Sequence, residues 1–418
     1  MQNTKKSGQP LLSQLLSFIP REIVEQAVDE HQSDYYYKTM TTFRQLVFMF
    51  YGIVSRIDSL NSLCKSLLFL GNKLTYLRIT ELPAASTLSD ANKNRHSDVF
   101  GTIYHRLVEH YQRYLSGSYL SMFINGEVDP KKVKIFDATT IKLMLEVYTG
   151  AGPTNMNGKR KGALKTHALL PLDRYVPEFI WMSPGSYHDS HFLGQLEFLP
   201  GYTYVFDKGY INYEIFKQWT HDNIFFVTRI KDWAAYSVQM TTHAQLYDFL
   251  GGGVICDENI ILHKGYQKNF LQARLITYKD PVSGKVLRFL TNNPHYQSQT
   301  IVALYKNRWL IETFFKQLKQ NFQLSYFYSD SKQGIKTQVW ISLIAQLIFT
   351  VIHKMVRESE LFSTIVSMAS ANLGSYQCLI HTINTKRLSG PERKIKIVQL
   401  NLFDINGGGV FEARNNSP

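Results

Sequence analysis

The sequence predicts an α/β protein in which a helical N-terminal region precedes a mixed β-sheet that carries a β-rich insertion. Three observations support this prediction. Apolar residues recur at three- and four-residue spacing up to about residue 114, as they do in amphipathic helices. Runs of branched and aromatic residues typical of strands begin near residue 133. Helical spacing returns from about residue 298, so helices flank the strands along the chain.

Composition and charge limit the classes of function. A chain of 418 residues is too long for one ordinary core, and its 44% hydrophobic content is enough for buried cores. The 46 basic and 33 acidic residues give a net charge of +13, which favours phosphate-rich partners. The three cysteines lie far apart, which argues against a disulfide framework and a thiolate zinc site. The longest apolar stretch, residues 339–352, is too short to cross a bilayer. We therefore expect a soluble, cytoplasmic protein without a membrane partner.

The N-terminal residues 1–115 are predicted to form a helical DNA-binding domain. Residues 43–70 show the strongest helical periodicity. Residues 82–87 have the composition of a turn followed by a helix start, with Ser86 or Thr87 as the N-cap. The next segment, residues 89–100, is polar and basic on one side, as expected either of the second helix of a DNA-reading pair or of an ordinary solvated helix.

Beyond a polar connection at residues 115–132, the order of elements indicates a particular type of sheet. Residues 130–230 are predicted to contain three strands, a helix, a strand, a helix and a strand, which is the order of a ribonuclease-H-like mixed sheet. The expected strands are residues 133–141, 167–170, 176–182, 202–206 and 224–230, with a turn at 171–174 and helices at 189–199 and 213–220.

The rest of the chain divides into three predicted parts. Residues 231–293 contain short strand-like runs and glycine-rich turns, so we expect a β-rich insertion that does not continue the core sheet. Residues 294–357 are expected to complete the core with a helix at 298–322 and a buried helix at 336–357. Residues 358–418 are assigned to a C-terminal region whose tail, from residue 407, is loose.

Two aspartates stand at chemically informative positions. Asp137 lies inside a strongly apolar strand, where a carboxylate is costly to bury unless it is paired or binds a metal ion. An acid at a sheet end or on an outward face is the alternative. Asp207 ends a strand and is followed by Lys208-Gly209-Tyr210, which would leave its carboxylate at the carboxyl edge of the sheet, where ligands bind. The alternative for Asp207 is a turn-forming residue.

A polar stripe is predicted on the helix at residues 298–322. At about 100° per residue, four of its side chains fall within an arc of roughly 60°. These are Tyr305, Arg308, Glu312 and Lys319. The opposite side is apolar and comprises Leu304, Leu310, Ile311, Phe314, Phe315 and Leu318. The stripe is also compatible with a solvated face on which Arg308 and Glu312 form a stabilising pair one turn apart.

Asp137, Asp207 and Glu312 together suit a site for two Mg²⁺ ions about 4 Å apart. Hard cations with oxygen ligands bind phosphates readily. One ion would activate water or a DNA 3′-hydroxyl, and the other would stabilise the leaving oxygen. We therefore predict that these three acids are both catalytic and metal-binding.

Three motifs resemble those of DDE transposases of bacterial insertion sequences, the large family numbered four among them. The first is Phe-Asp-Ala-Thr-Thr-Ile around Asp137, and the second is Asp207-Lys208-Gly209-Tyr210. The third is the Tyr-Arg-Glu-Lys signature, whose four residues are Tyr305, Arg308, Glu312 and Lys319. The likeness covers roughly residues 130–350.

The resemblance implies a transposase that binds its own terminal inverted repeats and performs a cut-and-paste reaction through DNA hairpins. It also implies Mg²⁺ or Mn²⁺ as cofactor, double-stranded DNA (transposon ends and target) as partner, a homodimer in the synaptic complex, and a nucleoid-associated place in a bacterial cytoplasm. Tyr305, Arg308 and Lys319 would hold the terminal phosphates. Trp233 is the only tryptophan in the insertion and is a candidate to receive a flipped base, although no motif ties it to that role.

Two other functions remain open at this point. One is a metal-dependent DNA nuclease that cuts without joining. The other is a non-catalytic DNA-binding protein derived from a transposase, against which the presence of all three acids argues.

Two further clusters are weaker candidates. His188, Asp189 and His191 have the composition of a metal cluster, but Asp189 is expected to cap the following helix and the histidines to be polar surface or to support the site. A glycine-punctuated loop offers four cations that either touch the DNA backbone or are simply solvated. These are Lys159, Arg160, Lys161 and Lys165.

Overall fold

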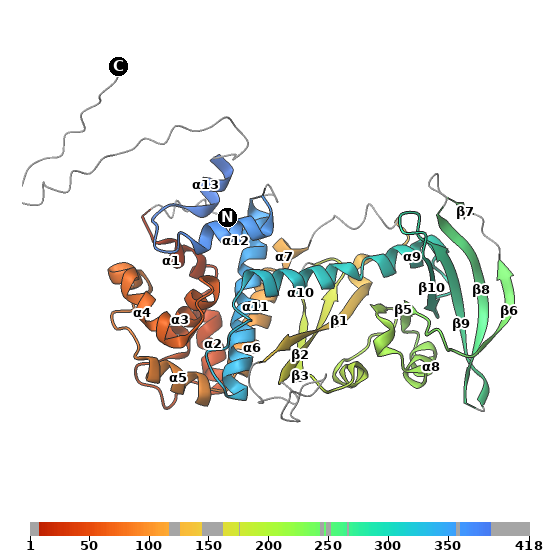
Figure 1. Cartoon of the computed structure of the whole chain (residues 1–418), viewed down its shortest axis with the longest axis horizontal. Coiled ribbons are helices and arrows are strands. Elements are labelled where there is room, and N and C mark those ends of the chain that lie inside the picture. Colours follow the sequence, from red (N-terminus) through yellow and green to blue (C-terminus); the bar gives the residue numbers. More distant parts are fainter. Residues whose placement is uncertain are drawn as a thin grey trace, which may run out of the picture.

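The computed structural model describes residues 8–116, 126–143, 162–174, 176–242, 246–247, 252–265, 267–356 and 360–385. Figure 1 shows an elongated molecule with the N-terminal helices at one end, the core sheet in the middle and the β-rich insertion at the other end. The long helix pair α9–α10 runs along the sheet between the two ends. The core sheet therefore lies between the N-terminal helices and the insertion, and α9–α10 runs along it.

The N-terminal region is helical, as its periodicity predicts. Its elements are α1 (Leu11–Leu16), α2 (Arg21–His31), α3 (Thr42–Val54), α4 (Leu60–Leu67), the 3-10 helix η1 (Leu68–Leu77), α5 (Ala85–Asn94), α6 (Asp98–His110) and α7 (Gln112–Leu115). Helix α3 begins where the Thr41 hydroxyl accepts a hydrogen bond from the backbone N–H of Arg44. Nearly all of its residues are buried, which makes it the central helix of this region.

Two predictions about residues 82–100 are wrong. Helix α5 begins at Ala85 without a side-chain cap, so Ser86 and Thr87 lie inside its first turn. The second wrong prediction is a single helix over the polar segment 89–100. This segment is divided between the end of α5 and the start of α6. At this junction Arg95 is only 2% exposed, and its guanidinium forms an ion pair with Asp34 at 3.1 Å and donates to Gln45. Because Arg95 holds the fold together, it does not form part of a DNA-reading surface.

The core sheet has the predicted ribonuclease-H-like order. Its strands are β1 (Val133–Lys142), β2 (Ala163–Pro171), β3 (Phe179–Pro184), β4 (Thr203–Phe206) and β5 (Phe225–Arg229). They are arranged β3-β2-β1-β4-β5, with β1, β2 and β3 antiparallel and β1, β4 and β5 parallel. The short elements around them are η3 (Pro130–Lys132), η4 (Asp189–Gln195), η5 (Lys208–Tyr210) and α8 (Tyr213–His221).

The connection between β3 and β4 differs from the prediction of a helix at residues 189–199. It forms the 3-10 helix η4, which ends at Gln195. The cap is also different, because the ring of His188 accepts from the backbone N–H of Ser190. Asp189, the residue predicted to be the cap, instead forms an ion pair with Lys165 at 2.8 Å.

The insertion is β-rich, as predicted, but it continues the core sheet. Its strands are β6 (Tyr236–Thr242), β7 (Leu246–Tyr247), β8 (Gly253–Lys264), β9 (Gln267–Lys279) and β10 (Val286–Thr291). Strand β10 pairs antiparallel with β5, and the sheet then runs through β9 and β8 to β6. The physical reason is that β5 would otherwise be an edge strand with unpaired backbone groups, which β10 satisfies.

The C-terminal helices are α9 (Ser298–Lys306), α10 (Trp309–Asn321), α11 (Lys332–Met355), α12 (Phe362–Ser370) and α13 (Leu379–Thr385). The single helix predicted at residues 298–322 is therefore divided at Asn307 and Arg308. Both residues keep right-handed helical dihedrals, so the two helices run nearly end to end (Figure 1). The tail from residue 407 lies outside the described residues.

The expectation that the apolar stretch at residues 339–352 is too short to cross a membrane is wrong for the whole helix α11, which is long and apolar enough by length and composition. However, 94% of its most apolar stretch is buried inside the protein. It packs against α3, α5 and α6 of the N-terminal region and against α12. One hydrophobic core continues from α1 through α11 to residues of β1, β4 and α10. A second core on the opposite face of the sheet packs α8 against Phe136 and Phe206. The predicted domain boundaries stay predictions.

Candidate active site

The two aspartates lie side by side because of the strand register. Phe136 of β1 pairs with Phe206 of β4 in parallel, and Asp137 and Asp207 are the residues that follow them. The phenylalanines face the core beneath α8, whereas Ile135 and Val205 belong to the core on the α10 side. Since side chains alternate along a strand, Asp137 faces α10 together with Ile135. The sequence alone did not establish this common orientation.

Arg308 links Asp137 to the third acid. Its Nη1 lies 3.0 Å from Asp137 Oδ2, and its Nη2 lies 2.6 Å from Glu312 Oε1. A planar guanidinium suits such a two-pronged contact with carboxylates. The pair with Glu312 is the one that helical spacing predicts, and the pair with Asp137 connects α10 to β1. One side chain thus brings two of the three predicted acids together.

Asp207 is held by a tyrosine and a second arginine. The Tyr305 hydroxyl donates to Asp207 Oδ1 at 3.2 Å, and Arg229 Nη2 lies 3.1 Å from the same oxygen. Tyr305 is buried, with its ring centroid 4.9 Å from that of Phe289 of β10. Sequence reasoning missed Arg229. Arg229 ends β5, and β5 pairs with β4, the strand that precedes Asp207. A cation at the end of this neighbouring strand was the available signal.

The two aspartates differ in electrostatic environment. Burial raises the pKa of Asp137 to about 6, against the opposing effects of the Ala138 backbone N–H and Arg308, and the neighbouring acids add to the rise. Burial also acts to raise the pKa of Asp207, but the Lys208 backbone N–H and Arg229 outweigh it and hold this pKa below its usual value. Asp207 is therefore the more readily ionised of the two.

The donor set suits a hard divalent cation. Carboxylate oxygens are the ligands that Mg²⁺ prefers in proteins, and Asp137, Asp207 and Glu312 supply them from three elements. Within the described part of the chain, no three acids, histidines or cysteines are grouped closely enough to hold an ion as they stand. Arg308 lies between two of the acids, so binding a metal would require it to exchange its partners.

Lys319 is the member of the predicted stripe that does not reach the acids. Its Nζ donates to the carbonyl oxygen of Thr140 at 2.8 Å, near the end of β1. Tyr305 and Arg308 therefore contact the acids. Lys319 lies farther along α10 and contacts β1 beyond Asp137.

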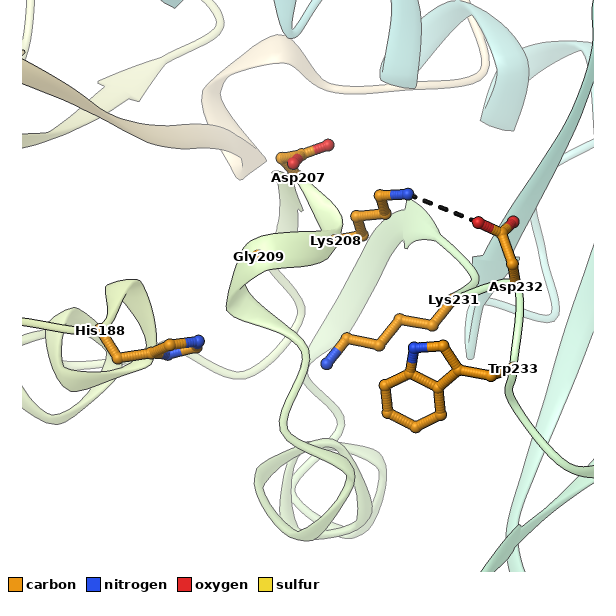
Figure 2. Close-up of a pocket in the computed structure, with 7 residues that line it drawn as sticks. All are labelled: His188, Asp207, Lys208, Gly209, Lys231, Asp232 and Trp233. Carbon is orange, nitrogen blue, oxygen red and sulfur yellow. Dashed lines mark ion pairs between the residues drawn. The ribbon is translucent and has the colours of Figure 1, made fainter. Parts of the chain in front are cut away.

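A cavity of about 420 Å³ opens beside Asp207. Figure 2 shows its lining residues, which are His188, Asp207, Lys208, Gly209, Lys231, Asp232 and Trp233. The indole of Trp233 is 76% exposed, and Lys231 Nζ lies 5.0 Å from its ring centroid. The candidate tryptophan of the insertion therefore shares a cavity with one of the predicted catalytic acids.

The weaker candidates take other roles. His188 caps η4 and lines the cavity, and Asp189 pairs with Lys165, so the described residues contain no metal-binding group made with His191. Lys165 also donates to the Tyr187 carbonyl, which leaves it less free to bind DNA. Residues 159–161 lie outside the described residues.

The strand order, with Asp137 on β1, Asp207 at the end of β4 and Glu312 on α10, is that of a ribonuclease-H-like protein. Residues 129–348 match the family described as the transposase DDE domain, and the chain belongs to this family. Residues 7–78 match a second family, described only as a domain of unknown function. DDE transposases generally use divalent metal ions. The prediction of a DDE transposase is confirmed, while the numbered subfamily stays a prediction.

Two relatives are transposases by name. "Putative transposase y4zB" of Sinorhizobium fredii is 26% identical over 276 residues, which cover 66% of this chain and 73% of the relative. "Probable transposase for insertion sequence element IS5377" of Geobacillus stearothermophilus is 22% identical over 52% of this chain and 56% of the relative. The cryo-EM structure of a piggyBac transposase synaptic complex with hairpin DNA aligns with a TM-score of 0.40 and 12% identity, covering 92% of this chain and 83% of that one.

Proposed function

We propose that this transposase binds the terminal inverted repeats of its own insertion sequence and catalyses DNA cleavage and strand transfer by cut-and-paste. The observation that supports this proposal most is the convergence of Asp137, Asp207 and Glu312 on one set of linked side chains. Arg308 contacts two of these acids, and Tyr305 contacts the third. A DNA-cutting site needs both the acids and cations for phosphate in one place.

Asp137, Asp207 and Glu312 would hold Mg²⁺, for which Mn²⁺ can substitute, and the ions would activate the attacking oxygen and stabilise the leaving one. Arg308 would grip a terminal phosphate with two parallel hydrogen bonds, since its guanidinium already makes a two-pronged contact at this place. Tyr305 would hold a terminal phosphate and, with Arg229, would orient Asp207. Arg229 would keep Asp207 ionised. Lys319 would hold a further phosphate as a point charge.

We further propose that Trp233 receives a flipped base when the cut end forms a hairpin. Its exposed indole offers a stacking face, and stacking on an aromatic side chain accepts any base. The adjoining cavity of about 420 Å³ borders Asp207, so an extruded nucleotide would stay close to the acids.

Recognition of the ends is proposed to involve residues 1–115 through a surface that does not include Arg95. The net charge of +13 supports a double-stranded DNA partner for both transposon ends and target. We expect the protein to act as a homodimer in the synaptic complex, in a bacterial cytoplasm in association with the nucleoid.

The test is to incubate the protein with the inverted-repeat ends of its element in Mg²⁺ and to score nicked, hairpin and joined DNA. The wild-type protein should give all three products. Asp137→Ala, Asp207→Ala and Glu312→Ala should each abolish cleavage while binding to the ends stays nearly unchanged. Cleavage without joining would indicate a nuclease, and end binding without cleavage by the wild type would indicate a non-catalytic DNA-binding protein.

A further inference from the structure

A second cavity, of about 440 Å³, lies at the far end of β1. It is lined by Thr140, Ile141, Lys142, Leu143, Lys319, Leu324 and Ser325. The two elements that form it are the ones that carry acids of the active site, because Asp137 lies on β1 and Glu312 on α10. The cavity is therefore a continuation of the active site along the same strand and helix.

Lys142 and Lys319 both line this cavity, and neither forms an ion pair with a carboxylate of the described residues. Lys319 is fixed by one hydrogen bond to the Thr140 carbonyl, which leaves two of its three N–H donors for a ligand. Burial, and then the neighbouring charge of Lys142, lower the pKa of Lys319. Two like charges held together beside a cavity attract an anion, because an anion relieves their mutual repulsion.

The cavity wall also fits a nucleotide strand. Ser325 adds a hydroxyl, and serine hydroxyls are common donors to phosphate oxygens. Ile141, Leu143 and Leu324 supply an aliphatic surface of the kind that packs against a sugar. Among the described residues no acid lines the cavity, so an anion is the expected occupant.

We propose that Lys142, Lys319 and Ser325 form a subsite for one backbone phosphate of the DNA strand that enters the active site. From the rise per residue of a β-strand, Lys142 lies about 16 Å along β1 from Asp137. From the rise per residue of an α-helix, Lys319 lies about 10 Å along α10 from Glu312. One strand of DNA carries a phosphate about every 3.4 Å along the axis. The phosphate in the subsite is therefore about three to five nucleotides from the scissile one.

This assignment rests on the proposed function, and the experiment separates the two. Duplexes of the transposon end are made with a single uncharged methylphosphonate at each position near the cleavage site. Their affinities are measured without metal for the wild type, Lys142→Ala, Lys142→Arg and Lys285→Ala. Lys285 is an exposed lysine in the turn that precedes β10, outside both cavities, and serves as the control.

One methylphosphonate, about three to five nucleotides from the cleavage site, should weaken wild-type binding by about three- to tenfold. Lys142→Ala should be insensitive to that single position and respond normally to all others. Lys142→Arg keeps the charge and should respond as the wild type does, as should Lys285→Ala.

If Lys142→Ala responds to every methylphosphonate as the wild type does, the subsite is wrong even though the ends are cleaved. If inorganic phosphate alone competes for the lysines and no strand position couples to Lys142, the cavity is a free-anion site and the strand assignment is overturned. If the wild type neither prefers nor cleaves the ends, the proposed function itself fails, and the subsite fails with it.

Discussion

At the scale of single residues, Arg308 joins two elements of the candidate site. Its guanidinium reaches Asp137 and Glu312 at once, so it lies where a phosphate must lie if these acids act on it. Its role in the fold and its proposed role on DNA involve the same atoms. The two roles can be separated only by measurements that respond to one of them.

Arg308→Ala should flatten the slope of log affinity against log salt for the transposon ends by about one unit, because one phosphate contact is lost. It should also lower the melting temperature, since two ion pairs disappear. Hairpin formation and joining should suffer more than the first nick, because these steps require the cut end to stay in place. If the melting temperature falls while the salt slope is unchanged, Arg308 serves only the helix and its acids.

The two aspartates predict opposite effects of pH on stability. The pKa of Asp137 is raised to about 6 in the folded protein, so on raising the pH this carboxyl loses its proton first in the unfolded chain. Ionisation of Asp137 therefore lowers the free energy of unfolding as the pH rises from about 4 to about 6. Asp137→Asn should therefore increase the free energy of unfolding at pH 7 by about 1 to 3 kcal/mol. Urea unfolding in a metal chelator measures it, and a less stable variant would contradict the prediction.

Asp207→Asn is the matched comparison. The pKa of Asp207 is lowered, so its stabilising contribution is present above the unfolded pKa and is lost as pH falls through the folded pKa. This substitution should decrease the free energy of unfolding at pH 7, and the difference from the wild type should shrink on acidification. The same sign for both variants would show that local packing, not ionisation, controls the result.

At the scale of elements, the crossing of α6 and α11 depends on one glycine. A Cβ at Gly101 would lie 3.0 Å from the indole of Trp340, so the two helices pack closely at this point. Helix α6 belongs to the N-terminal region and α11 to the C-terminal part, which makes this contact a junction between distant parts of the sequence.

Gly101→Val should lower the free energy of unfolding by about 1 to 3 kcal/mol, because the added methyl groups force α6 away from Trp340. Gly194→Val is the control, since a Cβ there meets nothing within 4 Å. Chemical unfolding of both variants checks the prediction. Equal changes in the two would mean that close approach of the helices is not what requires glycine.

At the scale of the whole molecule, the N-terminal region does not have a separate core. Helix α11 is buried among α3, α5 and α6, and one apolar cluster runs from α1 into the catalytic part. A fragment of residues 1–115 lacks α11 and would expose the faces that α11 covers. Tests of end recognition by this region therefore need the intact chain.

The fragment 1–115 should show no cooperative thermal transition, whereas a chain of residues 8–385 should unfold cooperatively. The reason is that the buried area contributed by α11 is missing from the shorter fragment. Circular dichroism during heating, with near-ultraviolet signals as a measure of side-chain packing, distinguishes the two. A sharp transition in the fragment would establish an independent N-terminal domain.

The sequence by itself predicted most of the helices and strands, the order of the core elements along the chain, and the three acids and polar stripe of the candidate site, but not Arg229. Each of these depends on spacing within a short stretch of chain. The periodicity around Glu312 and the glycine turn after Asp207 are local properties, and the physical rules that connect them to structure act over a few residues. The family likewise followed from motifs that can be seen in the chain.

Tertiary structure decided what these residues contact. Arg95 is buried because Asp34 and Gln45 surround it, and the insertion extends the sheet because β10 satisfies the free edge of β5. Arg308 reaches Asp137 for a similar reason, since α10 crosses the face of β1. All of these contacts join residues far apart in the chain, and their free energy depends on the packing of whole elements, which local spacing does not contain.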